Sequence, residues 1–245
     1  MNYIVKIFLC LLNLVAFSQE KNILQVEYDI FYNTDVPNTR KGVLQVYLKE
    51  NKSVFFEKEH SLGTKTENEG LDINFTYGVN ETPFVKMWGD NTTILYNDFW
   101  QKQTYLITDS INCNWDISYS ETKNIGNSLC NKATMTFRGR NYTAWYDANY
   151  PVHFGPWKFR GLPGLVMEIY DEEKRYNWLA TRISYTASSK DNFTEHRKKL
   201  TFREFKELRL ERIYNVDNSR LPRGTRVEIN YSKDKELERV FEWEE

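Results

Sequence analysis

The strongest constraint on the fold is an alternation of apolar and polar residues with a period of two. One face of an extended chain is shared by Leu24, Val26, Tyr28, Ile30 and Tyr32, and short runs of the same kind recur between Asn, Asp and Gly residues. We expect such strands at 44–48, 71–77, 84–88, 93–99, 104–107, 133–137, 142–146, 165–170, 176–185 and 226–231. The pattern predicts a mainly β protein, built as a curved antiparallel sheet or as an open barrel or half-barrel meander.

One segment near the C-terminus departs from this alternation. Thr201-Phe202-Arg203-Glu204 forms a capping box, in which the Thr hydroxyl and the Glu carboxylate bind reciprocal backbone donors. Phe202, Phe205 and Leu208 then follow helical spacing. We therefore predict one amphipathic C-terminal helix that covers a face or a mouth of the sheet.

Charge and composition exclude some classes of protein. The 245 residues include 33 Lys and Arg against 34 Asp and Glu, a net charge of −1, which speaks against nucleic acid as a partner. At 40% hydrophobic and 27% charged residues, the chain has the composition of a folded protein. No linker, repeat or low-complexity tract divides it, so we expect a single β-rich domain over residues 19–245.

The N-terminus predicts export. Lys6 precedes an apolar stretch at 7–17, which is too short to span a bilayer and suits a signal peptide over residues 1–18. The alternative is a buried N-terminal strand or helix. Phe8-Leu9 before Cys10 does not suit a lipoprotein, and no later stretch could form a transmembrane helix. We expect a protein of the periplasm, or one associated with the outer membrane, that is not a lipoprotein.

Export leaves two cysteines in the mature chain. Cys113 and Cys130 lie 17 positions apart and would form a plausible disulfide in an oxidising compartment. Such a bridge would stabilise the fold by about 3 kcal/mol. The alternative is two unrelated buried thiols.

The chain lacks the short motifs of common enzymes. It contains no phosphate-binding loop, dinucleotide fingerprint, H-E-x-x-H or G-x-S-x-G motif. His60, His153 and His196 are far apart, and none has a neighbour at metal-ligand spacing. We therefore assign no catalytic residue, no metal site and no cofactor.

The segment from Cys130 to Asp171 is the most distinctive. Its Arg138-Gly139-Arg140-Asn141 predicts a hairpin turn, and an irregular stretch at 147–164 follows with three of the six prolines. Leu162-Pro163-Gly164-Leu165 suits a type II turn with Gly at its third position. The stretch also carries four large rings, which predict a rigid, self-packed loop: Tyr150, Phe154, Trp157 and Phe159.

This segment resembles the GLPGLI family, exported proteins of the Bacteroidota. The resemblance is carried by Ala144-Trp145-Tyr146, Pro151, Gly155-Pro156, Phe159 and Gly161-Leu162-Pro163-Gly164-Leu165-Val166, with Val166 where the family name has Ile. It covers about forty residues, with similar residues upstream at Cys130, Lys132-Ala133-Thr134 and Phe137–Arg140. It implies an envelope-associated β protein of uncharacterised function, often encoded near outer-membrane receptors. It implies no catalytic residues.

Two sets of side chains in this segment are candidates for binding. The aromatic set either lines an apolar ligand groove or belongs to the core: Trp145, Tyr146, Trp157 and Phe159. The cationic set either binds a carboxylate or phosphate, or is solvated or paired with acids: Arg138, Arg140, His153, Lys158 and Arg160. The structural motif consists of Gly155, Pro156, Gly161, Leu162, Pro163 and Gly164.

These features favour a non-enzymatic exported protein over an enzyme. We expect it to bind an apolar ligand, a lipid or an envelope protein through the aromatic loop. One alternative is an envelope hydrolase that uses carboxylates or His153, with Asp147 close by in the sequence. Another is a structural adaptor of an outer-membrane receptor.

Overall fold

Strands dominate the part of the chain that the computed structural model describes, namely residues 22–35, 37–62, 85–90, 93–100, 103–187, 198–214 and 236–244. The strands are β1 (Ile23–Tyr32), β2 (Asn38–Tyr47), β3 (Lys52–Leu62), β4 (Val85–Gly89), β5 (Thr93–Trp100), β6 (Gln103–Ser110), β7 (Asp116–Ile125), β8 (Ser128–Phe137), β9 (Arg140–Asp147), β10 (Leu165–Asp171), β11 (Tyr176–Thr186) and β12 (Lys198–Thr201). The helix is α2 (Phe202–Tyr214). The expected signal peptide and the strands expected at 71–77 and 226–231 lie outside the described residues.

The twelve strands form one sheet made of two meanders. In the first, β1 to β6 pair consecutively, and in the second, β7 to β11 do the same, all antiparallel. The meanders join where β1 pairs antiparallel with β11, and β12 is added in parallel beside β6. Within the described residues the sheet stays open, with β12 and β7 at its edges. The mainly β, curved antiparallel fold is confirmed.

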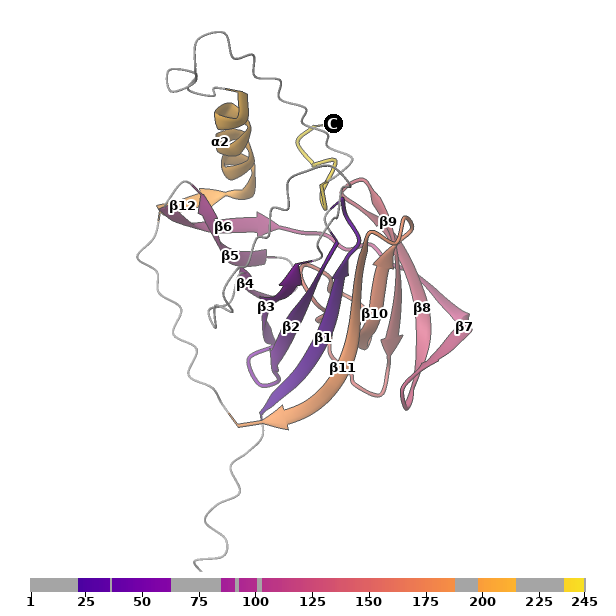
Figure 1. The fold of residues 1–245 in the computed structure, drawn as a ribbon. Coiled ribbons are helices and arrows are strands. Elements are labelled where there is room, and N and C mark those ends of the chain that lie inside the picture. The colour runs from indigo at the N-terminus through magenta and orange to yellow at the C-terminus, as the bar shows by residue number, and fades with distance from the viewer. Residues whose placement is uncertain are drawn as a thin grey trace, which may run out of the picture.

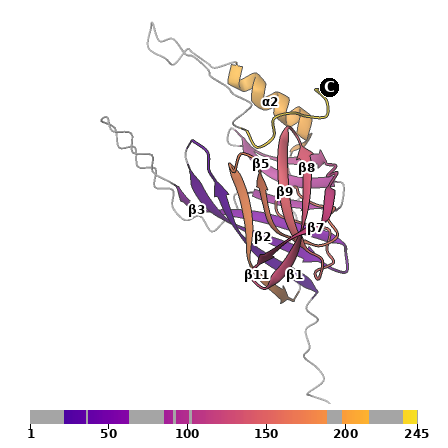
Figure 2. The same cartoon turned by 90° about the vertical axis from the view of Figure 1, so that its right-hand side faces the viewer.

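The sheet curves around a core on its concave face (Figures 1 and 2). In β1, Val26, Tyr28 and Ile30 are buried and alternate with partly exposed polar residues, as the period of two requires. Shifts of pairing register interrupt four of the strand pairs, including β9–β10 and β1–β11. Such bulges bend strands and increase their twist, which curves the sheet. One buried hydrogen bond crosses the core, from the Tyr28 hydroxyl to the Val166 carbonyl at 2.7 Å.

Helix α2 begins at the predicted capping box. The Thr201 backbone N–H donates to the Glu204 carboxylate at 2.7 Å, and the Glu204 N–H donates to the Thr201 hydroxyl at 3.2 Å. Phe205 then packs on Tyr105 of β6, with ring centroids 5.7 Å apart. The helix therefore lies over the β12–β6 end of the concave face, as Figure 1 shows.

Three strands escape the sequence pattern for physical reasons. In β3 the adjacent residues Val54 and Phe55 are both buried, although they point to opposite faces of the strand. Both faces therefore carry apolar residues, and the sequence shows no alternation there. β7 is an edge strand in which seven of the ten residues are exposed, so it lacks a continuous apolar face. β12 spans only four residues, too few to show a period.

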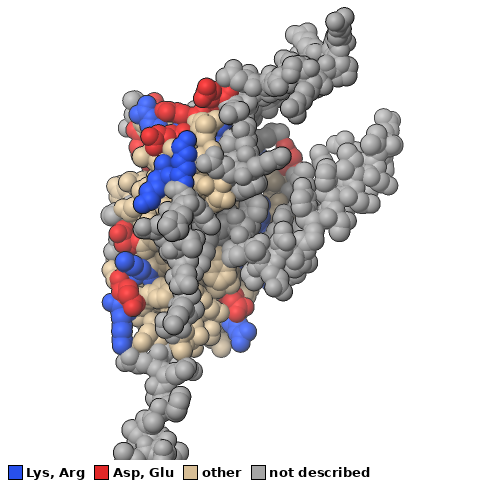
Figure 3. All heavy atoms as spheres, turned by 90° about the vertical axis from the view of Figure 1, so that its left-hand side faces the viewer, with Lys and Arg blue, Asp and Glu red and all other residues tan. Residues whose placement is uncertain are grey.

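The face of the molecule drawn in Figure 3 carries charges of both signs. In Figure 3, basic and acidic side chains lie interspersed on the visible face, in keeping with the near-zero net charge. Among these residues, the single helix is neither long nor apolar enough to span a membrane.

Candidate functional site

The connection between β9 and β10, residues 148–164, folds back over the concave face of the sheet. Its Trp157 stacks on Trp178 of β11, with ring centroids 6.1 Å apart and planes 14° from parallel. Its Phe159 meets Tyr142 of β9 edge to face, with centroids 4.9 Å apart. These rings are buried, so this loop forms part of the hydrophobic core.

A tight turn fixes the inner end of this loop. The Phe159 N–H donates to the Pro156 carbonyl at 3.1 Å, and the Gly155 N–H donates to the Phe159 carbonyl at 2.8 Å. Trp157 occupies the left-handed region with φ of +51°, which is rare for a bulky residue. The surrounding ring contacts hold it there, so Trp157 and Lys158 have fixed positions.

The expected type II turn at 162–165 is wrong. Gly164 does not adopt the positive φ that this turn requires at its third position, whereas Gly161 does, at +89°. A Cβ on Gly164 would lie 2.5 Å from the backbone oxygen of Asp147. Gly164 is therefore required for the close approach of β10 to the end of β9, and not for a turn.

The predicted hairpin turn between β8 and β9 is confirmed and has two residues. Arg138 and Gly139 have φ of +46° and +79°, and Phe137 pairs with Arg140 across the turn. Two positive φ angles are typical of a type I′ turn, whose twist matches the flanking strands.

Arg138 belongs to a buried cluster of charges. Its guanidinium binds Asp109 of β6 through two hydrogen bonds of 2.8 and 2.7 Å and also binds Glu238 and Glu242. Lys158 Nζ lies 2.7 Å from the Asp109 carboxylate and 2.8 Å from Glu238. Burial opposes ionisation of Asp109, but Lys158 and Arg138 outweigh it and lower the pKa of this carboxyl.

Arg140 is paired in the same way. Its side chain is 1% exposed and lies 2.8 Å from the equally buried carboxylate of Asp171. It also donates to the Glu236 carbonyl at 2.7 Å, and its guanidinium lies 4.8 Å from the centre of the Tyr176 ring. Arg138, Arg140 and Lys158 are therefore neutralised by acids inside the protein.

The last described residues, 236–244, here called the C-terminal segment, lie across this cluster. The Arg239 N–H donates to the Arg138 carbonyl at 2.9 Å, which holds the segment against the β8–β9 turn. Phe241 is buried and meets Phe202 of α2 edge to face at 5.4 Å. The C-terminal segment therefore joins the helix to the sheet through ion pairs and rings.

The predicted disulfide between Cys113 and Cys130 is absent, and both thiols are free. In the β7–β8 ladder, Asp116 pairs with Thr134, about 13 Å along β8 from Cys130. Cys113 precedes Asp116 by three residues and so lies beyond the start of β7. Its Sγ is 3.7 Å from the Lys158 carbonyl. The separation of the two cysteines exceeds the range that a disulfide can bridge.

The two rings of the Trp145–Tyr146 pair point to opposite faces of β9. Tyr146 is buried in the core, whereas Trp145 lies on the convex side, where the ammonium of Lys123 is 5.7 Å from its ring centre. Trp145 is thus separated from Trp157 and Phe159 by the sheet. The structure does not bring the four candidate rings into one groove.

His153 also lies apart from the buried cluster. It is exposed, and its Nδ1 is 3.0 Å from the Leu162 carbonyl. The Asp147 carboxylate instead accepts hydrogen bonds of 2.9 Å from the backbone and side chain of Asn149. The sequence neighbours Asp147 and His153 are therefore bonded to different groups.

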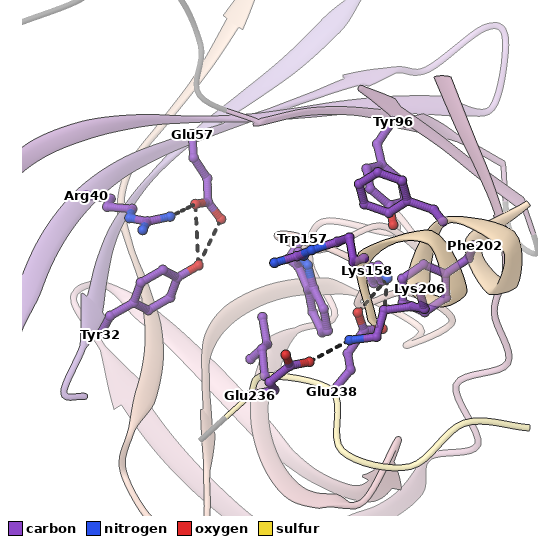
Figure 4. Close-up of a pocket in the computed structure, with 13 residues that line it drawn as sticks. Tyr32, Arg40, Glu57, Tyr96, Trp157, Lys158, Phe202, Lys206, Glu236 and Glu238 are labelled. Carbon is purple, nitrogen blue, oxygen red and sulfur yellow. Dashed lines mark hydrogen bonds and ion pairs between the residues drawn. The ribbon is translucent and has the colours of Figure 1, made fainter. Parts of the chain in front are cut away.

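A pocket of about 360 Å³ lies between the concave face, the Trp157–Lys158 turn, α2 and the C-terminal segment (Figure 4). Its lining consists of Tyr32, Arg40, Glu57, Tyr96, Trp157, Lys158, Phe202, Phe205, Lys206, Arg209, Glu236, Leu237 and Glu238. The volume falls within the range of small-molecule sites in proteins. Two of the predicted site residues, Trp157 and Lys158, therefore reach this pocket.

One wall of the pocket holds a buried carboxylate. Glu57 of β3 is 2% exposed and accepts hydrogen bonds from Arg40 at 3.2 Å and from the Tyr32 hydroxyl at 3.3 Å. Burial raises the pKa of Glu57, and the two donors only partly offset it. Burial also raises the pKa of the Tyr32 hydroxyl well above its ordinary value.

The opposite wall comes from α2 and the C-terminal segment. Lys206 lies 2.5 Å from the Glu236 carboxylate, and Lys158 binds Glu238. In Figure 4 these two pairs face the Arg40–Glu57 pair across the ring of Trp157. The pocket thus offers cations, carboxylates and aromatic surface together.

Sequence reasoning missed most of these pocket residues because they lie far apart in the chain. One feature could have found Glu57. It occupies the same inward-facing parity of its strand as the buried Phe55, where a carboxylate is unusual. An ionisable residue on the buried face of a strand marks a site for closer attention. Among the described residues, no group of His, Cys, Asp or Glu side chains is arranged to hold a metal ion.

Comparison with known families finds one match. Residues 138–168 match the model of a family described as a protein of unknown function (Porph_ging). The match runs from the β8–β9 turn through the buried loop into β10, the segment in which the sequence resembles the GLPGLI family. The matching family carries a different name, so membership of the GLPGLI family stays a prediction. No curated protein matches the chain.

Solved structures show a similar fold at low identity. Two structures of PNGF-II, in two different space groups, match 76% of this chain at 16% identity with TM-scores of 0.52 and 0.51. The chain spans about a third of the length of PNGF-II, 33% and 32%. An uncharacterized conserved protein from Thermus thermophilus matches 75% of this chain at 6% identity, covering 92% of its own length, with a TM-score of 0.40. The PNGF-II likeness shows a shared fold alone.

Proposed function

We propose that this chain is an exported binding protein that holds a small ligand in the pocket between the sheet, α2 and the C-terminal segment. The observation that carries the proposal is the pocket itself, because the sheet, the Trp157–Lys158 turn, α2 and the C-terminal segment all place ionisable side chains around it (Figure 4). Buried charges are costly unless they are paired, and the chain keeps several of them around this one cavity.

The lining favours a polar ligand over the apolar one expected from the loop. Phe159 and Tyr146 are packed inside the core and offer no open groove. The part of the loop that reaches the pocket is Trp157 with Lys158, opposite Glu57 and Arg40. Arg40, Lys206 and Glu236 keep 16, 11 and 28% of their side chains exposed, and an apolar ligand would remove this charged surface from water without giving it new hydrogen bonds.

Fluorine NMR of a fluorinated fragment library, with neutral, anionic, cationic and apolar members, tests the proposal. Leu237 lines the pocket, so Leu237→Trp fills part of it, whereas Val240 is exposed outside the lining and Val240→Trp serves as the matched control. We expect fragments that bind the wild type and the control to lose binding to Leu237→Trp. Equal binding to all three proteins, or no binding to the wild type, would contradict the proposal.

Export is the second part of the proposal and is supported by residues 1–18 of the sequence. The full-length chain, expressed in a Gram-negative host, should appear in the periplasmic fraction with Gln19 as its first residue. Intact-mass measurement of that fraction checks the cleavage site. A full-length mass in the cytoplasm would contradict export.

A second candidate function, hydrolysis, is favoured by Glu57 and not by His153. A buried carboxyl with a raised pKa, beside a hydroxyl and open to a pocket, has the properties of a general acid. His153 lies exposed outside the pocket lining. In a screen of hydrolase substrates, Glu57→Gln should abolish the turnover that the wild type shows, and turnover unaffected by Glu57→Gln would exclude this function.

A further inference from the structure

Six of the seven charged side chains of the pocket are arranged as three pairs, and the seventh, Arg209, has its guanidinium 5.9 Å from the centre of the Phe205 ring. Arg40 binds Glu57, Lys158 binds Glu238 and Lys206 binds Glu236, with nitrogen to oxygen distances of 3.2, 2.8 and 2.5 Å. The pairs come from different elements, so no single helix or strand imposes them. The lining therefore presents donors and acceptors side by side on both walls (Figure 4).

Pairing of this kind disfavours a charged ligand. An anion would compete with the three carboxylates for their cations and would itself lie beside Glu57, Glu236 or Glu238. A cation would meet the same obstacle from Arg40, Lys158 and Lys206. Like charges placed together in a partly dry site oppose binding strongly.

An uncharged ligand with hydroxyl groups avoids this obstacle. An ionised carboxylate has about four acceptor positions, so a hydroxyl can donate to Glu57 while Arg40 keeps its own bond to that carboxylate. An ammonium carries three N–H donors and a guanidinium five, so hydroxyl oxygens can also accept from Lys206 or Arg40. Each hydroxyl both donates and accepts, which matches a lining that does the same.

The aromatic residues of the lining can contact the C–H groups of such a ligand. Trp157, Tyr96 and Phe202 line the same cavity as the ion pairs, and Phe202 also lies 4.2 Å from the Lys158 ammonium. These rings are 5–6% exposed, so each offers a small apolar edge to the C–H groups of a ligand. The pocket thus combines polar pairs with ring edges, and its volume of about 360 Å³ limits the ligand to a small molecule.

We propose that this pocket binds a saccharide or a similar uncharged molecule, with hydroxyl groups toward the ion pairs and C–H groups toward the rings. This inference rests on the pocket being the binding site proposed above and adds the chemical class of its ligand. The ion pairs act as specificity determinants, because they reject the charged counterparts of the same molecule.

Matched sets of monosaccharides that differ in charge test the inference. Glucose, glucuronate and protonated glucosamine form one set, and the corresponding galactose and mannose compounds form two more. Saturation-transfer NMR with the mature chain should show at least one neutral sugar binding about tenfold more tightly than both charged counterparts, the effect of about one hydrogen bond to a charged group. Leu237→Trp should lose this binding, and Val240→Trp should keep it.

Two single variants should then shift the preference in opposite directions. Glu57→Gln removes the carboxylate that Arg40 binds, so the uronate should gain about tenfold relative to the neutral sugar. Arg40→Gln removes the cation and should favour the protonated amino sugar instead. Circular dichroism of both variants verifies folding, and either variant alone can refute the inference if its preference does not move.

The remaining outcomes separate this inference from the proposed function. Tightest binding of a charged sugar would overturn the charge-pair argument. Binding of apolar or charged fragments in the pocket, with no sugar bound, would overturn the ligand class and leave the binding pocket intact. Failure of every fragment and every sugar to bind the wild type would overturn both.

Discussion

Replacing Asp109 with Asn should destabilise the protein by about 3–5 kcal/mol. The Asp109 carboxylate lies between two buried cations, with oxygen to nitrogen distances of 2.7 and 2.8 Å to Arg138 and 2.7 Å to Lys158. All three side chains are 2% exposed. Asn keeps the shape of Asp but removes its charge, so the two buried cations would share Glu238, with only the 56% exposed Glu242 as a further partner of Arg138. Breaking a buried pair in this way is costly.

A second substitution tests whether charge balance causes this loss. Arg138, Lys158, Asp109 and Glu238, the cluster members that are at most 13% exposed, contribute two charges of each sign, so Asp109→Asn leaves one cation in excess among them. Glu242 also binds Arg138, but it is 56% exposed, so water screens its charge. Adding Lys158→Met restores the balance. We expect the double variant to be more stable than Asp109→Asn alone, with a coupling energy of about 1–3 kcal/mol. Lys158→Met by itself should cost less than Asp109→Asn, because Asp109 keeps Arg138.

Urea unfolding followed by far-ultraviolet circular dichroism measures all four proteins. The slope of the free energy of unfolding against urea should stay constant across the set, which shows that the same surface is exposed in each case. A loss of less than about 1 kcal/mol for Asp109→Asn would refute the reasoning, since a value in that range is typical of exposed pairs. Strict additivity of the two substitutions would refute it equally.

Three further predictions follow from individual residues. The pKa of Glu57 is raised in the folded state, so its contribution to the free energy of unfolding is complete below the ordinary glutamate pKa of about 4.3 and falls as pH rises through the raised pKa. The wild type should therefore lose stability relative to Glu57→Gln over that pH range. Urea unfolding at several pH values measures this, and a constant difference between the two proteins would contradict it. In thermal unfolding, Gly164→Ala should destabilise the protein more than Gly161→Ala. The first change places a Cβ 2.5 Å from a backbone oxygen, whereas the second costs about 1–2 kcal/mol because alanine must adopt a left-handed backbone conformation. The reverse order would contradict the packing described for Gly164. Thiol titration of the unfolded mature chain without reductant should find Cys113 and Cys130 both free, and a mass two hydrogens lower would show a bridge.

Much of the fold could be predicted from the sequence because local rules determine it. The alternation in β1 survives in the structure as buried Val26, Tyr28 and Ile30, and the Thr201 capping box begins the helix. These features depend only on near neighbours in the chain. The edge strand β7 escaped prediction because an exposed strand has no continuous apolar face to reveal it.

Less of the candidate site could be predicted from the sequence, because it depends on ion pairs between residues far apart in the chain. The cationic residues of the 138–168 segment were recognised, but their partners Asp109 and Glu238 lie 29 and 100 residues from Arg138 in the chain. The predicted disulfide is wrong because the sequence separation of the two cysteines does not reveal how β7 and β8 pair. In the hairpin, the start of β7 lies opposite Thr134 and not opposite Cys130. The type II turn failed because Gly164 serves a steric contact with Asp147, a contact between strand ends that no local pattern encodes.

The binding pocket beside Trp157 is tested most directly by a titration followed in nitrogen–proton correlation spectra of the mature chain. Its tightest-binding neutral sugar or fragment is added stepwise, and the indole signal of Trp157 is identified with Trp157→Phe. The largest shifts should fall on that indole and on the backbone amides of Trp157 and Lys158, which line the pocket. Largest shifts on the exposed edge strand β7, with the Trp157 signals unmoved, would contradict the assignment of this pocket as the binding site.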